Sequence, residues 1–191
     1  RIFMLDIWET IFIIERVFDD QSESRRAIMF EFLKKGIEVK IIAPISGRIR
    51  DITEVPDEVF SQKMVGDGIA IEPSDGLVVA PCRGKIVQIF NTNHAVGIRT
   101  REGLDILIHL GIDTVELKGE GFTRIAEVDG EIHPGEPLIQ MDLKKIRTLG
   151  KDTVSPILIT NPEVINEITK ETGIIVAGKD RIMTIKMKNN Y

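Results

Sequence analysis

Residues 89–122 read IFNTNHAVGIRTREGLDILIHLGIDTVELKGEGF and contain the pattern that decides the fold. Two apolar, alternating runs, VGI (96–98) with its upstream flank and LDILIHLGI (104–112), are typical of half-buried β-strands. The polar segment RTREG between them ends at Gly103, as is typical of a hairpin turn. The stretch therefore predicts an antiparallel hairpin that carries two of the chain's 3 histidines, one within each apolar run.

The register of this hairpin determines whether the two imidazoles meet. An even-numbered loop centred between Arg101 and Glu102 places His94 directly opposite His109 on one face, with Cβ atoms about 4.5–5.5 Å apart. An odd-numbered loop without a compensating bulge shifts the register by one residue and sends the rings to opposite faces. Gly103 makes a bulged odd-numbered loop a real alternative, but the geometry of short hairpin loops favours the face-to-face arrangement.

Composition is that of an ordinary soluble chain, with 191 residues of which 42% are hydrophobic and 29% charged. The net charge of −5 and the lack of any long basic run argue against nucleic acid as a partner. A weakly acidic surface is instead suited to docking on a basic protein. The single cysteine, Cys82, excludes an internal disulfide framework and is consistent with a cytoplasmic location, which we expect.

The N-terminal segment differs from the rest of the chain. The apolar sequence RIFMLDIWETIFIIERVF is interrupted by Asp6, Glu9 and Glu15, so it falls short of the roughly 20 apolar residues that a membrane-spanning helix needs. The sequence does not begin with methionine. We expect residues 1–35 to be a tail, either non-native or a linker, with no membrane span, and residues 36–191 to form one domain.

From Ile37 onward the sequence is typical of an all-β protein. Short apolar segments such as VKIIAPI, GIAIEP, GLVVAP, GKIVQIF and SPILIT are separated by Gly, Pro, Asp and Ser at intervals of about 8–12 residues. Two segments are predicted to be helical: VPDEVFSQ (55–62), and NPEVINEITKETG (161–173), which combines an N-capping asparagine with a proline at the first helical position. The pattern predicts an antiparallel sandwich or barrel with one or two short helices.

An internal repeat runs through this region. The segment IAPISGRIRDI (42–52) aligns with VAPCRGKIVQI (79–89) at an offset of 37 residues, and GEIHPGEPLI (130–139) is a partial third copy without the Ala-Pro pair. Two matching units of this kind can close an antiparallel β-sandwich about a pseudo-twofold axis. The alternative is that similar turn sequences recur in unrelated parts of an all-β protein.

Most familiar site motifs are absent from the sequence. It lacks GxGxxG, GxxxxGK[ST], CxxC, HExxH, HxH and GxSxG, which leaves the pair His94 and His109 as the candidate site. Such a pair can bind a metal with a nearby carboxylate, perform acid–base chemistry, or provide a nucleophile. The Thr92 hydroxyl can accept a hydrogen bond from Nδ1–H of His94, and a carbonyl at Gly111 or Asp113 can hold the second ring. Two rings that are each held by one nitrogen could bracket a phosphoryl group.

At these residues the sequence resembles a known family. GLDILIHLGIDTV (103–115) is similar to the phosphohistidine motif of the glucose-type enzyme IIA of the bacterial phosphoenolpyruvate-dependent sugar phosphotransferase system. TNHAVGI (92–98) resembles the family's second histidine segment, and VELKGEGF, VGDGIAI and IAPISG match as well. The similarity extends from about Ile37 to Lys188. It implies an antiparallel β-sandwich built from a duplicated motif.

The resemblance also implies a role for each site residue. His109 is similar to the residue that is phosphorylated, and His94 to the ring that stabilises the phosphoryl group. Thr92 corresponds to the residue that holds the second ring, and Gly111 to the one whose carbonyl orients the nucleophile. The positions that match the family's docking surface are Asp57, Val59, Phe60, Leu107 and Asp113. Leu107 replaces the aromatic residue of the best-known members.

The partners implied by the resemblance are proteins. The phosphocarrier protein HPr would give a phosphoryl group to His109, which would pass it to the IIB domain of a glucose-family permease for sugar uptake and phosphorylation. The unphosphorylated protein would bind regulatory targets such as transporters or kinases. No cofactor is required, although some relatives hold a zinc ion between the rings that correspond to His94 and His109 and a carboxylate of a bound partner.

Two other functions are considered. A zinc-dependent hydrolase of related fold would use His94, His109 and an aspartate, but the lack of an HxH pair argues against it. A biotinyl- or lipoyl-type carrier domain is suggested by GEIHPGEPLI, but no lysine here has the required hairpin setting. His133 is expected to be exposed and Cys82 to be a packing residue, both outside the site.

Overall fold

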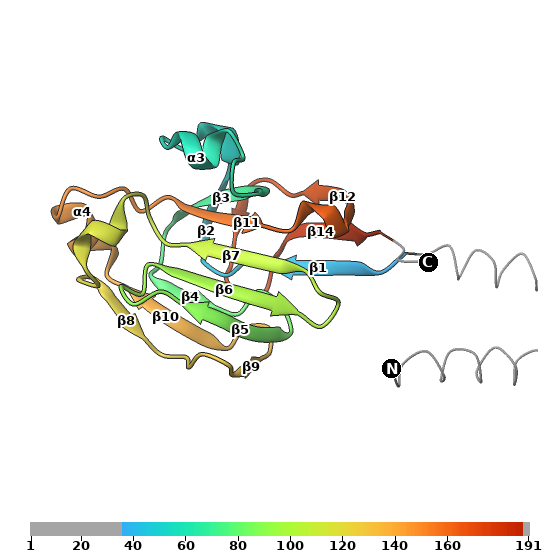
Figure 1. Ribbon diagram of the computed structural model, residues 1–191. Helices are drawn as coiled ribbons and strands as arrows, with labels where there is room; N and C mark the ends of the chain where they lie inside the picture. Colours follow the sequence, from blue (N-terminus) through green and yellow to red (C-terminus); the bar gives the residue numbers. More distant parts are fainter. Residues whose placement is uncertain (1–35, 189–191) are drawn as a thin grey trace, which may run out of the picture. The chain divides into compact units, whose positions relative to one another are not determined.

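The computed structural model describes residues 36–188, which form layers of antiparallel β-strands (Figure 1). The largest sheet has eight strands in the order β13-β2-β3-β11-β7-β6-β5-β9. These strands are β2 (Gly47–Asp51), β3 (Asp67–Pro73), β5 (Gly84–Ile89), β6 (Ala95–Thr100), β7 (Asp105–His109), β9 (Glu131–Ile132), β11 (Ser155–Ile159) and β13 (Ile174–Ile175).

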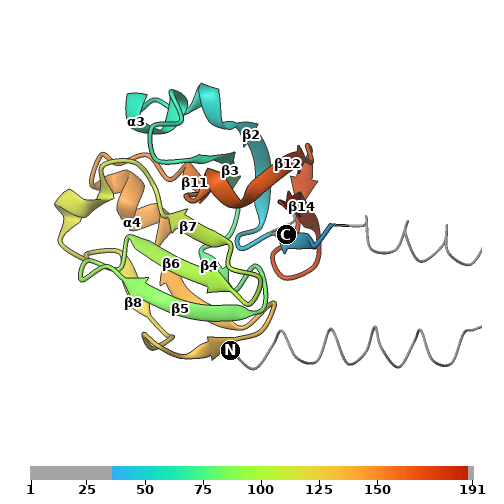
Figure 2. The same ribbon diagram turned by 45° about the vertical axis from the view of Figure 1, so that its right-hand side comes forward.

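Two three-stranded sheets complete the fold, with the orders β1-β14-β12 and β4-β10-β8. Their strands are β1 (Glu38–Ile42), β4 (Leu77–Val79), β8 (Phe122–Arg124), β10 (Pro137–Met141), β12 (Ile165–Lys170) and β14 (Arg181–Met187). The helices among the described residues are α3 (Glu58–Ser61), α4 (Leu143–Thr148) and the 3₁₀ helices η1 (Ile52–Glu54), η2 (Thr114–Leu117) and η3 (Pro162–Val164). Figures 1 and 2 show α3 beside β3 and on the opposite side of the molecule from β5 and β8. The predicted antiparallel β-sandwich is confirmed.

The repeat in the sequence corresponds to a duplication in the structure. The Ile42 N–H donates to the Pro81 carbonyl (2.9 Å), and the Val79 N–H, at the matching position of the second copy, donates to the Pro44 carbonyl (2.8 Å). The eight-stranded sheet is symmetric about its middle. Counted inward from one edge its strands are β13, β2, β3 and β11, and counted inward from the other edge their counterparts are β9, β5, β6 and β7. A pseudo-twofold axis therefore relates the two halves of the domain.

Strand register matches the halves residue by residue. Ile49 and Ile86 are counterparts in the repeat, and their cross-strand partners are Ile71 and Ile98. All four side chains are buried in the main core, on the inner face of the eight-stranded sheet. Because side chains alternate between the two faces of a strand, other counterparts can be found by counting from these positions.

A second, smaller core lies on the outer face of the eight-stranded sheet, where η1 and α3 cover it. Its members are Ile52, Val55, Phe60, Ala70, Ile112 and Leu158. The helix begins after Asp57, whose carboxylate accepts hydrogen bonds from the Val59 N–H (2.7 Å) and the Phe60 N–H (3.3 Å). The helix predicted within residues 55–62 is therefore present, although it is only one turn long.

The helix predicted for residues 161–173 is wrong. After η3 the chain forms β12, whose Ile165 and Ile168 both pack against the main core. A spacing of three residues is expected on one face of a helix, whereas a regular strand would place these side chains on opposite faces. A bulge between Ile165 and Glu167 changes the alternation and brings both isoleucines to the same side.

Helix α4 was not predicted from the sequence. Asp142 caps it by accepting a hydrogen bond from the Lys145 N–H (2.9 Å), and Ile146 is its only fully buried side chain. A helix of this length shows too few apolar positions for its period to be recognised.

Among residues 36–188, no helix is both long and apolar enough to cross a membrane. The tail expected over residues 1–35 lies outside the described residues.

Candidate functional site

Four rings form a row beside the ends of β6 and β7. The ring centroids of Phe60 and His109 are 4.9 Å apart, those of His109 and His94 are 5.1 Å apart, and those of His94 and Phe90 are 5.3 Å apart. The two histidine rings lie at 75° to each other. The prediction that the imidazoles meet is confirmed.

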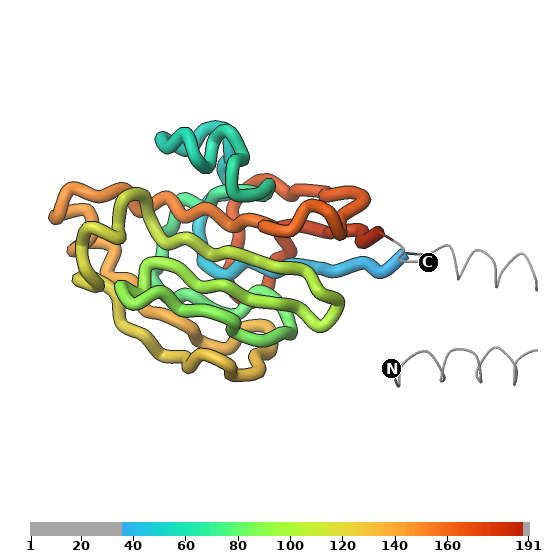
Figure 3. The backbone as a smooth tube through the Cα atoms, viewed as in Figure 1, coloured from blue at the N-terminus to red at the C-terminus, as the bar shows by residue number. Residues whose placement is uncertain are grey.

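The predicted register of the hairpin, however, is wrong. Ala95, not His94, pairs with His109, because Gly103 adopts a positive φ of 88° and the turn is centred on Glu102. The rings meet despite this shift because His94 lies just before β6 and follows Asn93, which has a φ of 54°. The alternation of the strand therefore does not fix the direction of the His94 side chain. Figure 3 shows the β6–β7 turn at the end of the hairpin away from α4.

His109 is held by the chain that follows it. Its Nδ1 lies 2.8 Å from the Gly111 carbonyl oxygen, which can only accept a hydrogen bond, so Nδ1 carries the proton. In the neutral ring the lone pair is then on Nε2. Gly111 has a φ of 79°, and a Cβ at this position would lie 2.6 Å from both the Asp152 carbonyl oxygen and the Thr114 methyl group. The site therefore requires glycine here.

His94 is held by a side chain from the preceding turn. The Thr92 hydroxyl is hydrogen-bonded to Nδ1 of His94, and the His94 carbonyl accepts a hydrogen bond from the Leu110 N–H (2.7 Å). His94 is only 6% exposed. Thr92, His94, His109 and Gly111 thus lie together, as the sequence predicts.

Burial keeps both imidazoles uncharged at neutral pH. Burial lowers the pKa of His94 to about 4, and the neighbouring His109 adds to the shift. Burial also lowers the pKa of His109, although the hydrogen bond to Gly111 and the carboxylates of Asp57 and Asp113 oppose this effect. Each neutral ring can offer one nitrogen, so the pair can combine a nucleophile with a hydrogen-bond donor.

An open groove lies next to the rings on the outer face of β5, β6 and β7. It has a volume of about 200 Å³, and its lining includes Val87, Phe90, Gly97 and Leu107. Phe90 is 36% exposed, and the side chain of Val87 is also solvent-accessible. The lining of the groove is mainly apolar, and the Arg99–Asp105 ion pair also belongs to it.

The predicted docking residues do not all lie in one kind of environment. Leu107 lines the groove and Val59 is exposed, but Phe60 is buried against His109 and belongs to the small core. Asp57 and Asp113 both lie close enough to His109 to affect its charge. The predicted docking residues therefore combine an apolar patch with two carboxylates near His109.

Sequence reasoning missed three residues of the site. Phe90 contacts His94 and could have been found, because it is an aromatic residue in the same turn. Gly97 forms part of the groove lining, and the buried Ser155 accepts a hydrogen bond from the Gly111 N–H (3.1 Å). Ser155 gave no signal, since it is far from both histidines in the sequence.

Two residues that were placed outside the site do lie outside it. Cys82 is part of the main core, where burial raises the pKa of its thiol to about 12 and keeps it unreactive. His133 is exposed and pairs with Glu136, with 3.2 Å between Nδ1 and Oε1.

Comparisons with known proteins agree with this fold. The family model of the phosphoenolpyruvate-dependent sugar phosphotransferase system, EIIA 1, matches residues 39–165. The chain therefore belongs to this family of EIIA proteins. The solved structure of glucose permease IIA from Mycoplasma capricolum superposes with a TM-score of 0.72 at 37% sequence identity, covering 78% of this chain and 96% of that one.

Individual relatives are glucose-type members of the family. The glucose-specific EIIA component of Haemophilus influenzae is 46% identical over 152 residues, which is 80% of this chain and 92% of the relative. That of Bacillus cereus is 42% identical over 161 residues, covering 84% and 98%. The glucose-specific EIICBA component of Staphylococcus saprophyticus is 42% identical over 168 residues, which is 84% of this chain but 24% of the longer protein.

Proposed function

We propose that the protein is a phosphocarrier that takes a phosphoryl group from HPr onto Nε2 of His109 and passes it to a IIB domain during sugar uptake in the cytoplasm. The observation that carries this proposal is the hydrogen bond from Nδ1–H of His109 to the Gly111 carbonyl (2.8 Å). It leaves the lone pair of a neutral ring on Nε2, beside a second imidazole.

The transfer is an exchange of one phosphorus–nitrogen bond for another. The bond between phosphorus and the donor imidazole of HPr breaks, and its electron pair stays on that nitrogen. A new bond forms between phosphorus and Nε2 of His109. The onward step breaks this bond in turn and forms one to a cysteine or histidine of the IIB domain. Because the transition state is loose and its charge lies on the equatorial oxygens, the protein mainly positions the groups and stabilises charge.

His94 is the group that stabilises this charge. A neutral imidazole donates from one nitrogen only, so donation from Nε2 to a phosphoryl oxygen requires a lone pair on Nδ1. The Thr92 hydroxyl is then the hydrogen-bond donor and Nδ1 of His94 is the acceptor. This assignment reverses the direction that the sequence suggested for that hydrogen bond, in which Thr92 accepts.

Docking uses the groove and the acidic residues around it. The outer face near Leu158 is covered by the chain's own α3, whereas the face beyond Leu107, which borders both the small core and the groove, is open. A partner that places apolar side chains in the groove would cover this second face in a similar way. Asp57 and Asp113 would pair with basic residues of HPr and of the IIB domain, which accounts for the acidic rim. Regulatory targets that bind the unphosphorylated protein would use the same surface.

The two histidines also supply part of a metal site. Among residues 36–188, no group of three His, Cys, Asp or Glu side chains is arranged to hold a metal ion. His94 and His109 would therefore hold zinc only with a carboxylate from a bound partner, in the tetrahedral N/O coordination that zinc prefers. This arrangement suits a partner interface better than the zinc-dependent hydrolase considered above, which needs a third ligand from the chain itself.

Radiolabelling tests the proposal directly. Incubation with enzyme I, HPr and ³²P-labelled phosphoenolpyruvate should label the wild-type protein and should not label His109→Gln. His94→Gln should accept the label but pass it slowly to a IIB domain. His133→Gln, altered at the exposed histidine outside the site, serves as the control and should behave like the wild type. Full labelling of His109→Gln would refute the proposal.

A further inference from the structure

A buried hydroxyl lies behind the segment that orients His109. Ser155 is 0% exposed and opens β11, the strand adjacent to β7. Its Oγ lies 3.1 Å from the Gly111 backbone nitrogen and 2.9 Å from the Thr153 carbonyl oxygen. A hydroxyl has a single proton, and the Thr153 carbonyl can only accept it. Toward Gly111, the Ser155 hydroxyl is therefore an acceptor.

Gly111 is anchored on both sides by the same stretch of chain. Its N–H donates to Ser155, and the next N–H, that of Ile112, donates to the Asp152 carbonyl (3.0 Å). The Ile112 N–H and the Gly111 carbonyl belong to one planar peptide group, so fixing one fixes the direction of the other. Gly111 has a φ of 79°, and because glycine reaches many backbone conformations, these two hydrogen bonds restrict it to one.

We propose that Ser155 is a positioning residue for His109: by holding the Gly111 N–H, its hydroxyl keeps the Gly111 carbonyl aimed at Nδ1 and so selects the tautomer with a free Nε2. The inference rests on the proposed function, because it is the Nε2 lone pair that attacks phosphorus. The tautomer of a histidine is set by the hydrogen bond that its other nitrogen makes. Ser155 thus acts on the nucleophile through one backbone residue and does not touch the phosphoryl group.

The test compares two isosteric variants. Ser155→Thr keeps the hydroxyl and Ser155→Val removes it, while both add similar bulk. The ¹⁵N chemical shifts of the His109 ring, measured on unphosphorylated protein, report the tautomer. Ser155→Val should shift the ring toward the Nε2–H form and lower the initial rate of phosphorylation roughly threefold to tenfold, the effect of losing about one hydrogen bond. Ser155→Thr should keep the wild-type tautomer and rate.

A matched control separates this effect from a general loss of stability. The buried Thr100 hydroxyl accepts a hydrogen bond from the Leu104 N–H (3.2 Å) at the far end of the same hairpin. Thr100→Val removes the same kind of bond and should leave both the His109 tautomer and the phosphorylation rate unchanged. Equal effects of Thr100→Val and Ser155→Val on the tautomer would overturn the proposal.

Further measurements keep the proposal testable if Ser155→Val does not fold. Ser155→Ala removes the hydroxyl without adding atoms and should give the same tautomer shift. In the wild-type protein the Gly111 amide should exchange slowly with D₂O, and exchange at the rate of a free chain would refute the proposal. A tautomer shift in a protein that takes no phosphoryl group would count against the proposed function alone. An unchanged tautomer in Ser155→Val with normal phosphorylation would count against Ser155 alone.

Discussion

The two halves of the domain share one backbone design and differ in what covers the outer face of the eight-stranded sheet. In the first half, the connection between β2 and β3, residues 52–66, carries η1 and α3 and closes this face with the small core. In the second half, the connection between β5 and β6 is only residues 90–94, and the groove lies open. The site thus lies at the border where the cover formed by α3 ends and the shorter connection leaves the sheet open.

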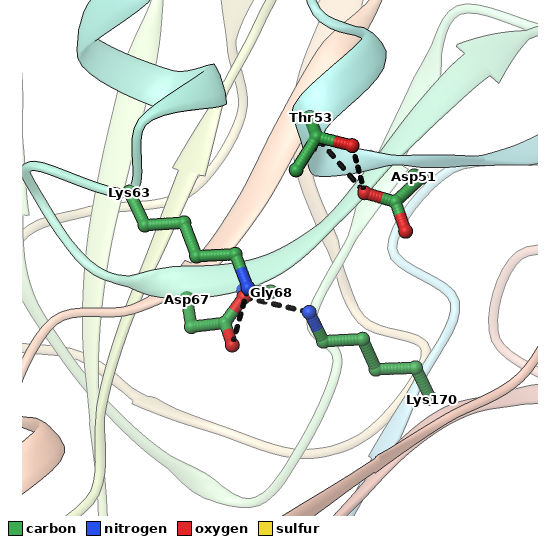
Figure 4. Close-up of polar contacts among 6 residues, drawn as sticks. All are labelled: Asp51, Thr53, Lys63, Asp67, Gly68 and Lys170. Carbon is green, nitrogen blue, oxygen red and sulfur yellow. Dashed lines mark hydrogen bonds and ion pairs between the residues drawn. The ribbon is translucent and has the colours of Figure 1, made fainter.

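The counterpart of His94 is an aspartate. His94 is four residues before Ile98, and Asp67 is four residues before the matching Ile71. Figure 4 shows the Asp67 carboxylate facing two lysines. Its oxygens lie 2.6 Å from Nζ of Lys170 and 3.2 Å from Nζ of Lys63. Where the second half has an uncharged imidazole, the first half has a satisfied ion pair.

The counterpart of His109 is a leucine. Ile98 pairs with Ile106, and its counterpart Ile71 pairs with Ser155, so Ile106 and Ser155 are counterparts. His109 and Leu158 each follow three residues later and are therefore counterparts as well. Leu158 is fully buried in the small core beneath α3. The comparison teaches that the strand frame alone does not create the site. A polar ring and an open face have to occur together.

The largest expected effect compares alanine at these two matched positions. Leu158→Ala should lower the free energy of unfolding by about 2–5 kcal/mol, because it leaves a cavity in a closed core. His109→Ala should lower it by less than about 1 kcal/mol, since His109 is partly exposed and the cost of removing its polar ring from water offsets much of the gain from packing. Urea denaturation at pH 7 measures both values. Equal losses would mean that the two faces are not differently covered.

The next comparison uses two glycines at opposite ends of the β6–β7 hairpin. Gly111→Ala should lower the free energy of unfolding by about 3 kcal/mol, because it combines a positive φ with contacts at 2.6 Å to the Asp152 carbonyl oxygen and the Thr114 methyl group. Gly103→Ala has a similar φ of 88° but nothing within 4 Å of the added Cβ, so about 1 kcal/mol is expected. Only Gly111→Ala should slow phosphorylation, as measured by the initial rate of labelling. If the two variants lose equal stability, the contacts around Gly111 do not constrain it.

Part of the fold and of the site could be predicted from the sequence. The duplicated frame and the meeting of two histidines followed from the offset repeat and from the alternation around His109. The register did not follow, because the turn conformation at Gly103 decides it and the sequence allowed both loop types. The convergence was predicted correctly through a wrong register, since the direction of His94 depends on the turn at Asn93.

Other features could not be predicted because they depend on contacts between distant segments. The bulge in β12 made Ile165 and Ile168 look like one face of a helix. Ser155 gave no local sign of its contact with Gly111, which follows the end of the neighbouring strand β7. Local patterns report local geometry, whereas these two features arise from how strands pair.

A smaller effect distinguishes the matched pair His94 and Asp67 by pH. The folded pKa of His94 is about 4 and its ordinary value is 6.5, so the unfolded chain binds the proton more readily. Stability should be full above pH 6.5 and fall as the pH drops to about 4, by up to roughly 2 kcal/mol after allowance for solvent screening. His94→Gln should reduce this slope, as measured by urea midpoints between pH 7 and 4. His109, whose pKa burial also lowers, accounts for the part that remains.

Asp67 should act in a different pH range. Burial raises the pKa of its carboxyl, but hydrogen bonds from Lys170 and Lys63 outweigh burial and hold it below its usual value of 3.8. The stability that it contributes is present above pH 3.8 and is lost only as the pH falls below that value. Asp67→Asn should therefore leave the slope between pH 6.5 and 4 unchanged. If the pH dependence of stability between pH 6.5 and 4 were lost in Asp67→Asn but kept in His94→Gln, it would have to be assigned to Asp67 and not to His94.

The smallest expected effect concerns the lysines of the first half. Lys170→Met should lower the free energy of unfolding by less than about 1 kcal/mol, and Lys63→Met by less still, because its ion pair is longer and more exposed. Both losses should become smaller in 1 M salt, where the Debye length is about 3 Å, and the more exposed Lys63 pair should lose the larger share. Phosphorylation should be unaffected, since the cluster lies in the closed half. A lysine variant that slowed phosphorylation without losing stability would mean that the two halves communicate through the sheet, and the contrast between a structural half and a functional half would then no longer hold.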